Sequence, residues 1–295
     1  MTSGPDGSGD DATARFYLDA PVQWVDTGTA RLACRRYGSG PPLLLVHGFP
    51  LSGFTWRNVL PELSKHHTCY VPDLPGMGES EWTDQTDFSF PGQGRTLKAL
   101  VHRLGLDRYA VLAQDTGGTF ARYLALTDGA RVEKLMLINT EVPHHRPPWI
   151  PLYQWLMHVP GALAGFGVLL RSRTFLRSGM GFGGCFTDLT LIEGDFHEHV
   201  VQPLLDSARR MDGMARYLRG LVWGPVDDLA KAHARLTMPV ELIWGADDPT
   251  FPVAQARTMV TQFPDARLVE IPGARLLVHE EKPADVVRAV LGFLG

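Results

Sequence analysis

Asp115 lies where an apolar run meets a helical pattern. Residues 109–112 are apolar, and residues 119–126 have the spacing of a helix that packs on one side. The small residues Ala113 and Gly117 flank the aspartate at two positions on either side, as a sharp turn of the backbone requires. The pattern predicts a carboxylate at the apex of a strand–turn–helix unit, where it would be a nucleophile. An aspartate before a glycine-rich helix start can instead be an N-cap.

Two further motifs follow predicted strands. The apolar run 43–46 ends in His-Gly-Phe-Pro at 47–50, and the run from Val240 ends in Trp-Gly-Ala-Asp-Asp-Pro at 244–249. Runs without polar alternation are typical of central parallel strands, which are buried on both faces. Because the carboxyl ends of parallel strands meet at one edge of a sheet, both motifs are expected beside Asp115.

With Gln-Asp-Thr-Gly-Gly at 114–118, these motifs resemble the aspartate-nucleophile group of the α/β-hydrolase superfamily. Haloalkane dehalogenases and epoxide hydrolases make up this group. The resemblance implies that Asp115 is the nucleophile and that the backbone N–H groups of Phe49 and Thr116 form an oxyanion hole. Such donors stabilise the charge that grows on a carbonyl oxygen when an ester intermediate is hydrolysed. The resemblance implies no cofactor and no metal.

The acid of the implied catalytic triad is expected at Asp248, directly before a proline as in relatives, with Asp247 as a solvated neighbour. Its task would be to orient an imidazole and stabilise its charge. Some haloalkane dehalogenases place the acid after an earlier strand, and Asn139 occupies that position here. An amide cannot replace the carboxylate, which favours Asp248. Glu141, two residues further along, is a weaker alternative.

The catalytic histidine of the group is missing from its usual place. Aligning Glu-Glu-Lys-Pro at 280–283 with the relatives' motif puts Leu276 at the position of the base. His279 follows three residues later and is an alternative, displaced base. Attack of Asp115 on carbon needs only an ionised carboxylate, whereas hydrolysis of the resulting ester needs a proton acceptor. Without an imidazole, the ester accumulates, another group activates water, or the reaction is not a hydrolysis. A fourth alternative is that the leucine was introduced on purpose to inactivate the protein.

The substrate is expected to be an apolar small molecule, as opposed to a macromolecule, with a bulky shape. Haloalkane dehalogenases hold halide with side-chain N–H groups at the positions of Phe49 and Thr116, which carry none here. Epoxide hydrolases use two tyrosines of the cap as proton donors, and Tyr153 and Tyr217 lie in the corresponding segments. Trp56 is a further candidate substrate-binding residue.

The alternation of strands and helices predicts an α/β fold with a mostly parallel central sheet and an inserted helical cap. Residues 15–140 and 224–295 are assigned to the core, residues 141–223 to the cap, and residues 1–14 to a disordered tail. The core should begin with a hairpin between residues 15 and 36. The active site is expected between core and cap.

Composition excludes several classes of partner. The net charge of −4 without a basic stripe argues against nucleic acid and membrane surfaces. Cys34, Cys69 and Cys185 have neither disulfide nor metal-ligand spacing, which favours a reducing, cytoplasmic location. The protein is expected to be a monomer or a homodimer. We therefore predict a hydrolase of epoxide-hydrolase type. A dehalogenase, a non-hydrolytic enzyme such as a cyclase and a ligand-binding pseudo-hydrolase are the alternatives.

Overall fold

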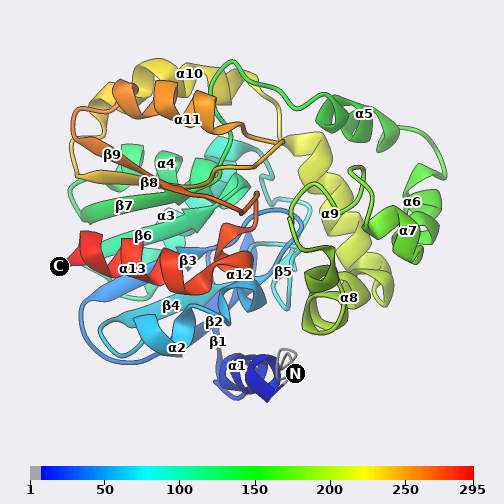
Figure 1. The fold of residues 1–295 in the computed structure, drawn as a ribbon, viewed down its shortest axis with the longest axis horizontal. Coiled ribbons are helices and arrows are strands. Elements are labelled where there is room, and N and C mark those ends of the chain that lie inside the picture. Colours follow the sequence, from blue (N-terminus) through cyan, green and yellow to red (C-terminus); the bar gives the residue numbers. More distant parts are fainter. Residues whose placement is uncertain (1–7) are drawn as a thin grey trace, which may run out of the picture.

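The computed structural model describes residues 8–295, and a 9-stranded sheet organises them (Figure 1). The strands lie in the order β1-β2-β4-β3-β6-β7-β8-β9, and β5 pairs with β2. Neighbouring strands from β4 to β9 in this order are parallel, whereas β1, β2 and β5 pair antiparallel. Their bounds are β1 Val22–Asp26, β2 Ala30–Tyr37, β3 Pro42–Val46, β4 Thr68–Pro72, β5 Glu81–Trp82, β6 Tyr109–Gln114, β7 Val132–Ile138, β8 Val240–Gly245 and β9 Ala266–Ile271. The predicted α/β class and mostly parallel sheet are confirmed.

The central strands are buried on both faces because helices cover the two sides of the sheet. Every residue of β6 and of β8 is buried, as expected for apolar runs without alternation. Figure 1 shows α2 and α13 on one side of the sheet, and α4, α10 and α11 on the other. The bounds of the core helices are α2 Leu60–Leu63, α3 Phe90–Arg103, α4 Thr116–Asp128, α10 Gly224–Ala232, α11 Val253–Met259, α12 Val278–Glu281 and α13 Pro283–Leu294, with the 3-10 turn η1 at Gly53–Trp56.

The N-terminal region differs from the prediction. Residues 8–14, expected in a disordered tail, belong to helix α1 (Ser8–Leu18), and the hairpin of β1 and β2 begins only at Val22. Tertiary contacts stabilise the helix: Ala14 and Tyr17 are buried, and the Tyr37 hydroxyl donates to the Tyr17 carbonyl at 2.7 Å. The glycine- and serine-rich composition of the first residues does not indicate a helix, because the buried residues that stabilise it lie at its end. The first seven residues of the predicted tail lie outside the described part of the chain.

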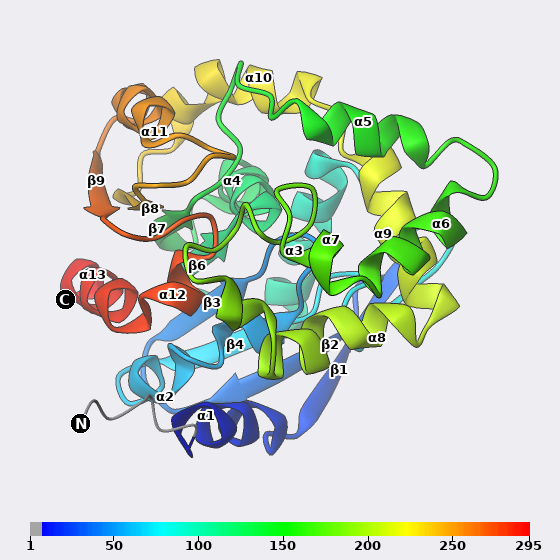
Figure 2. The ribbon, with the colours of Figure 1, turned by 45° about the vertical axis from the view of Figure 1, so that its right-hand side comes forward.

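Helices fill the connection between β7 and β8, as the sequence predicts for residues 141–223. They are α5 Trp149–Leu156, α6 Ala162–Leu170, α7 Arg173–Leu176, α8 Gln202–Leu205 and α9 Ala208–Gly220, with short turns at Leu189–Ile192 and His197–Val201. Figure 2 shows α5 to α9 as a layer beside the sheet. Within residues 8–295, no helix has the length and apolar character needed to cross a membrane.

Candidate active site

Asp115 forms a tight turn between β6 and α4. Its backbone has φ 51° and ψ −132°, a conformation that L-residues rarely adopt and that is found mainly where function requires it. Glycines make room for the turn: a Cβ at Gly48 would lie 2.4 Å from the Asp115 Cβ, and one at Gly117 would lie 2.3 Å from the His47 carbonyl oxygen. The Asp115 side chain makes no capping hydrogen bond to α4. Asp115 therefore occupies the N-cap position of α4 without capping the helix through its side chain.

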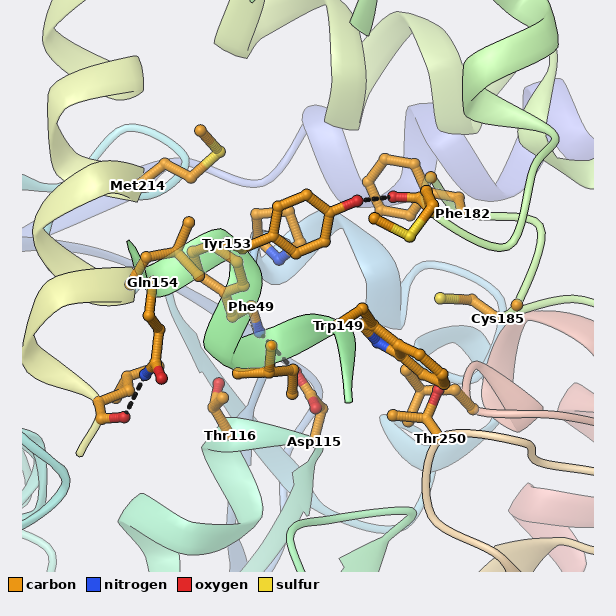
Figure 3. Close-up of a pocket in the computed structure, with 18 of the residues that line it drawn as sticks. Phe49, Asp115, Thr116, Trp149, Tyr153, Gln154, Phe182, Cys185, Met214 and Thr250 are labelled. Carbon is orange, nitrogen blue, oxygen red and sulfur yellow. Dashed lines mark hydrogen bonds between the residues drawn. The ribbon is translucent and has the colours of Figure 1, made fainter. Parts of the chain in front are cut away.

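The Asp115 carboxylate faces the two backbone donors of the expected oxyanion hole. The Phe49 N–H donates to Asp115 Oδ2 at 2.9 Å, shown by a dashed line in Figure 3. Burial raises the pKa of Asp115 well above its ordinary value, and the neighbouring Glu141 raises it further. The N–H groups of Thr116 and Phe49 act in the opposite direction, because they favour the ionised form.

A cavity of about 180 Å³ lies above Asp115, between the core and the helices α5 to α9. Figure 3 shows Asp115 and Thr116 where β6 meets α4, with Phe49 and Tyr153 above them. The walls are mostly apolar and include Phe166, Phe182, Met214, Trp223 and Leu276. Such a surface suits an apolar ligand, because few side chains would pair with polar groups of a ligand.

Asp248 follows β8 and is paired with the asparagine at the alternative acid position. Asn139 Nδ2 donates to Asp248 Oδ2 at 2.8 Å, and the Thr250 N–H donates to Oδ1 at 2.8 Å. Both side chains are buried. Burial raises the pKa of Asp248 from 3.8 to about 7, against the effect of these donors. Neither Asp248 nor its neighbour Asp247 belongs to the lining of the cavity in the described part of the chain.

This raised pKa predicts a pH-dependent loss of stability. A carboxyl that holds its proton more tightly in the folded state stabilises the fold below the unfolded pKa, and that stability is lost as pH rises through the folded value. Wild type should therefore lose free energy of unfolding between about pH 4 and pH 7 through Asp248. In Asp248→Asn this pH-dependent loss should be absent. The free energy of unfolding in urea should therefore become larger for the variant than for wild type as pH rises. Asp247→Asn, at an exposed position, is the control. Parallel curves for wild type and Asp248→Asn would contradict the prediction.

Leu276 lines the cavity, and His279 does not reach it. Among the cavity-lining residues described, only Leu276 comes from the segment 274–281. His279 is fully buried elsewhere: its Nε2 lies 2.7 Å from Thr55 Oγ1, and its ring packs against Trp56 at a tilt of 37° with centroids 4.8 Å apart. Burial lowers the pKa of His279 to about 3, so the ring is neutral. Trp56, considered for substrate binding, packs in this cluster outside the cavity lining.

The two tyrosines considered as proton donors have different positions. Tyr153 on α5 lines the cavity, and its hydroxyl donates to the carbonyl of Met180. Tyr217 on α9 is buried, and its hydroxyl donates to Gln93 Oε1 at 3.0 Å. It is not part of the cavity lining in the described chain. Only Tyr153 is thus placed to contact a ligand.

Glu141, the weaker alternative for the acid, lines the cavity together with Asp115. Its Oε2 accepts a hydrogen bond from Thr119 Oγ1 at 2.5 Å and lies 3.1 Å from Thr140 Oγ1. Burial raises its pKa. The buried Arg122 donates to Thr119 Oγ1 at 2.6 Å and to the Glu141 backbone carbonyl at 2.8 Å. Thr119, Thr140 and Arg122 were not among the residues predicted for the site. The i, i+3 spacing of Thr119 and Arg122 on α4 puts these two on one face of the helix and is the signal that could have found them.

Comparisons with known proteins identify the family of the chain. The model of the alpha/beta hydrolase fold family matches residues 41–283. The chain is 32% identical to the soluble epoxide hydrolase of Corynebacterium sp. strain C12, over 87% of this chain and 91% of the relative. It is 28% identical to Haloalkane dehalogenase 2 of Mycobacterium bovis, over 92% of this chain and 94% of the relative. The solved structure of the epoxide hydrolase CorEH has a TM-score of 0.79 at 24% identity, with 92% of this chain and 98% of that chain covered. The chain therefore belongs to the alpha/beta hydrolase fold family, as its motifs predict, and epoxide hydrolases and haloalkane dehalogenases are among its homologues.

Proposed function

We propose that the protein opens the epoxide ring of a bulky apolar substrate by nucleophilic attack of Asp115. The observation that carries the proposal is the Asp115 carboxylate, held by the Phe49 N–H at 2.9 Å at the base of an apolar cavity. Because Oδ2 accepts this bond, Oδ1 is the oxygen that attacks. The product is an alkyl ester of Asp115 whose carbonyl oxygen lies at the N–H groups of Phe49 and Thr116, the arrangement that lowers the barrier to its hydrolysis.

An epoxide fits this cavity better than an alkyl halide. Halide needs side-chain N–H donors near the nucleophile, and Phe49 and Thr116 offer a phenyl ring and a hydroxyl group. An epoxide instead needs a proton for the oxygen that leaves carbon. We assign Tyr153 to substrate contact, since it lines the cavity while its hydroxyl proton is engaged by Met180. Asp248 is assigned to the loop after β8, where Asn139 and the Thr250 N–H hold its carboxyl group.

The direct test is covalent labelling by styrene oxide. We expect intact-mass spectrometry to show one adduct per chain, and peptide mapping to place it on Asp115, because a long-lived ester forms wherever hydrolysis is slower than attack. In a single turnover in ¹⁸O-water, the oxygen that the diol gains should come from the protein, since the ester is cleaved at its carbonyl carbon. Labelled oxygen in the diol itself would show direct attack by water and exclude a nucleophilic role for Asp115.

The second candidate is a ligand-binding pseudo-hydrolase. Leu276 favours it, because a leucine at the position of the base removes the usual proton acceptor. Under this alternative, no adduct would form with styrene oxide, and an apolar ligand would bind tightly and reversibly. The labelling experiment therefore separates the two functions.

A further inference from the structure

Thr140 connects Asp115 to Glu141 through its hydroxyl group. Its Oγ1 is 2.7 Å from the Asp115 backbone carbonyl oxygen and 3.1 Å from Glu141 Oε2. A hydroxyl has one proton, and a carbonyl oxygen can only accept, so the shorter contact uses that proton. The contact with Glu141 is then completed either by a shared Thr140 proton or by a proton on the Glu141 carboxyl, and Thr119 Oγ1 donates to the same Glu141 oxygen at 2.5 Å. The cluster therefore accommodates a protonated Glu141.

The charges around the cavity decide which of the two carboxyl groups can ionise. Asp115 and Glu141 are both buried, and both line the cavity. The guanidinium of Arg122 contacts the cluster through Thr119, Thr140 and the backbone carbonyl of Glu141, and no direct bond to either carboxylate is described in residues 8–295. Two carboxyl groups that share a low-dielectric site do not both ionise, and they titrate as a pair. Burial raises both pKa values, and the neighbouring Glu141 raises that of Asp115 further, whereas the Thr119 hydroxyl and Arg122 act to lower that of Glu141.

We propose that Glu141 is the general acid and then the general base of this site, in place of an imidazole at position 276. The inference rests on the proposed function, because it concerns the same Asp115 ester. It identifies the proton source for ring opening and the proton acceptor for hydrolysis in one residue. The reactive form of the pair has an ionised Asp115 and a protonated Glu141.

In the first half-reaction, Asp115 Oδ1 forms a bond to an epoxide carbon, and the bond from that carbon to the ring oxygen breaks. The electron pair of this bond goes to the ring oxygen, which takes the proton of Glu141 and becomes a hydroxyl group. The products are a neutral ester at Asp115 and an ionised Glu141. Because the ester has no charge, the repulsion between the two groups is gone when Glu141 must remain a carboxylate.

In the second half-reaction, the Glu141 carboxylate takes a proton from water as the water oxygen bonds to Cγ of Asp115. The negative charge on the former carbonyl oxygen is stabilised by the N–H groups of Phe49 and Thr116. When the tetrahedral intermediate collapses, the bond from Cγ to the substrate oxygen breaks, and that oxygen takes the proton of the new Asp115 carboxyl group. The diol leaves, and Asp115 is again ionised and Glu141 protonated.

The test uses two electrophiles with the same carbon skeleton. Styrene oxide needs a proton on its departing oxygen, whereas 2-phenylethyl bromide releases bromide without one. In Glu141→Gln, which keeps the shape and the partners of the side chain, alkylation by styrene oxide should fall about 10²- to 10⁴-fold, the usual contribution of acid–base catalysis. Alkylation by the bromide should change less than about threefold, and both esters should persist after excess reagent is removed.

Several outcomes would overturn the inference while the proposed function stands. Equal losses with both electrophiles would mean that Glu141 only supports the turn at Asp115. Unchanged decay of the ester in Glu141→Gln would exclude its role as base. If wild type is neither labelled by the two electrophiles nor converts them to product, the proposed function fails together with the inference.

Two further variants control for folding. Glu241→Gln removes an equally buried carboxyl on β8 that pairs with Arg267 outside the cavity, and its labelling rates should match wild type. Glu141→Asp keeps the acid on a shorter side chain, so its ratio of epoxide to bromide rates should lie between those of wild type and Glu141→Gln. If Glu141→Asp has the same ratio of epoxide to bromide rates as Glu141→Gln, the position of the carboxyl group is as important as its proton. If it has the wild-type ratio but its ester decays slowly, one residue does not serve as both acid and base, and the inference is wrong.

Discussion

Asp115→Asn is expected to abolish labelling by apolar epoxides and, at neutral pH, to raise the Tm of the protein. An amide oxygen is a far weaker nucleophile than a carboxylate, so no ester forms. The asparagine oxygen can still accept the Phe49 N–H, which preserves the turn. Burial and Glu141 raise the pKa of Asp115, so ionisation of this group destabilises the fold as pH rises through the folded pKa. The neutral amide removes that cost, a trade of stability for activity that is common at active sites.

Intact-mass spectrometry and thermal unfolding measure the two effects in one preparation. Asp247→Asn is the matched control, since this carboxyl lies in the exposed part of the loop after β8. It should keep wild-type labelling and Tm. An adduct of undiminished yield in Asp115→Asn would identify a different nucleophile, and a lower Tm would mean that the Asp115 charge is well compensated in the fold.

The residues around Asp115 show what a single sequence predicts well. The strand before Asp115, the helix after it and the small residue Gly117 at the turn all follow from local rules, because a buried strand, a sharp turn and small residues leave one arrangement. The parallel sheet then brings Phe49 beside the aspartate, since both follow neighbouring strands. These positions depend on backbone geometry, which short motifs specify.

Side-chain direction is where the prediction is incomplete. Tyr217 has the residue type of a proton donor, but the helical phase of α9 directs its hydroxyl to Gln93. Glu141 lies only two residues beyond Asn139, and the change of chain direction after β7 brings it to the cavity. Helix α1 forms because Tyr17 packs on the distant Tyr37, with ring centroids 6.1 Å apart. Each of these features depends on contacts between segments far apart in the chain.

Leu276→His, introduced into Glu141→Gln, is expected to restore hydrolysis of the Asp115 ester. The segment before Leu276 lies against the end of β8: the Asp247 N–H donates to the Ala274 carbonyl at 3.0 Å. An imidazole at position 276 would have the Asp248 carboxylate to orient it. Leu276 lines the cavity together with Asp115, so that imidazole would face the ester as well. We expect decay of the ester to accelerate about 10²- to 10⁴-fold relative to Glu141→Gln alone.

The rate is measured by labelling with 2-phenylethyl bromide, removing the reagent and following the loss of the adduct mass. This electrophile forms the ester without an acid, so the measurement isolates the second half-reaction. Leu276→Gln in the same background is the control, because it adds a polar side chain that accepts no proton from water at neutral pH. If both double variants release the adduct equally fast, solvent access at position 276 and not a base limits hydrolysis. If only the histidine variant releases it, Asp248 is still able to support an imidazole, and the protein retains the parts of a triad whose proton transfer Glu141 has taken over.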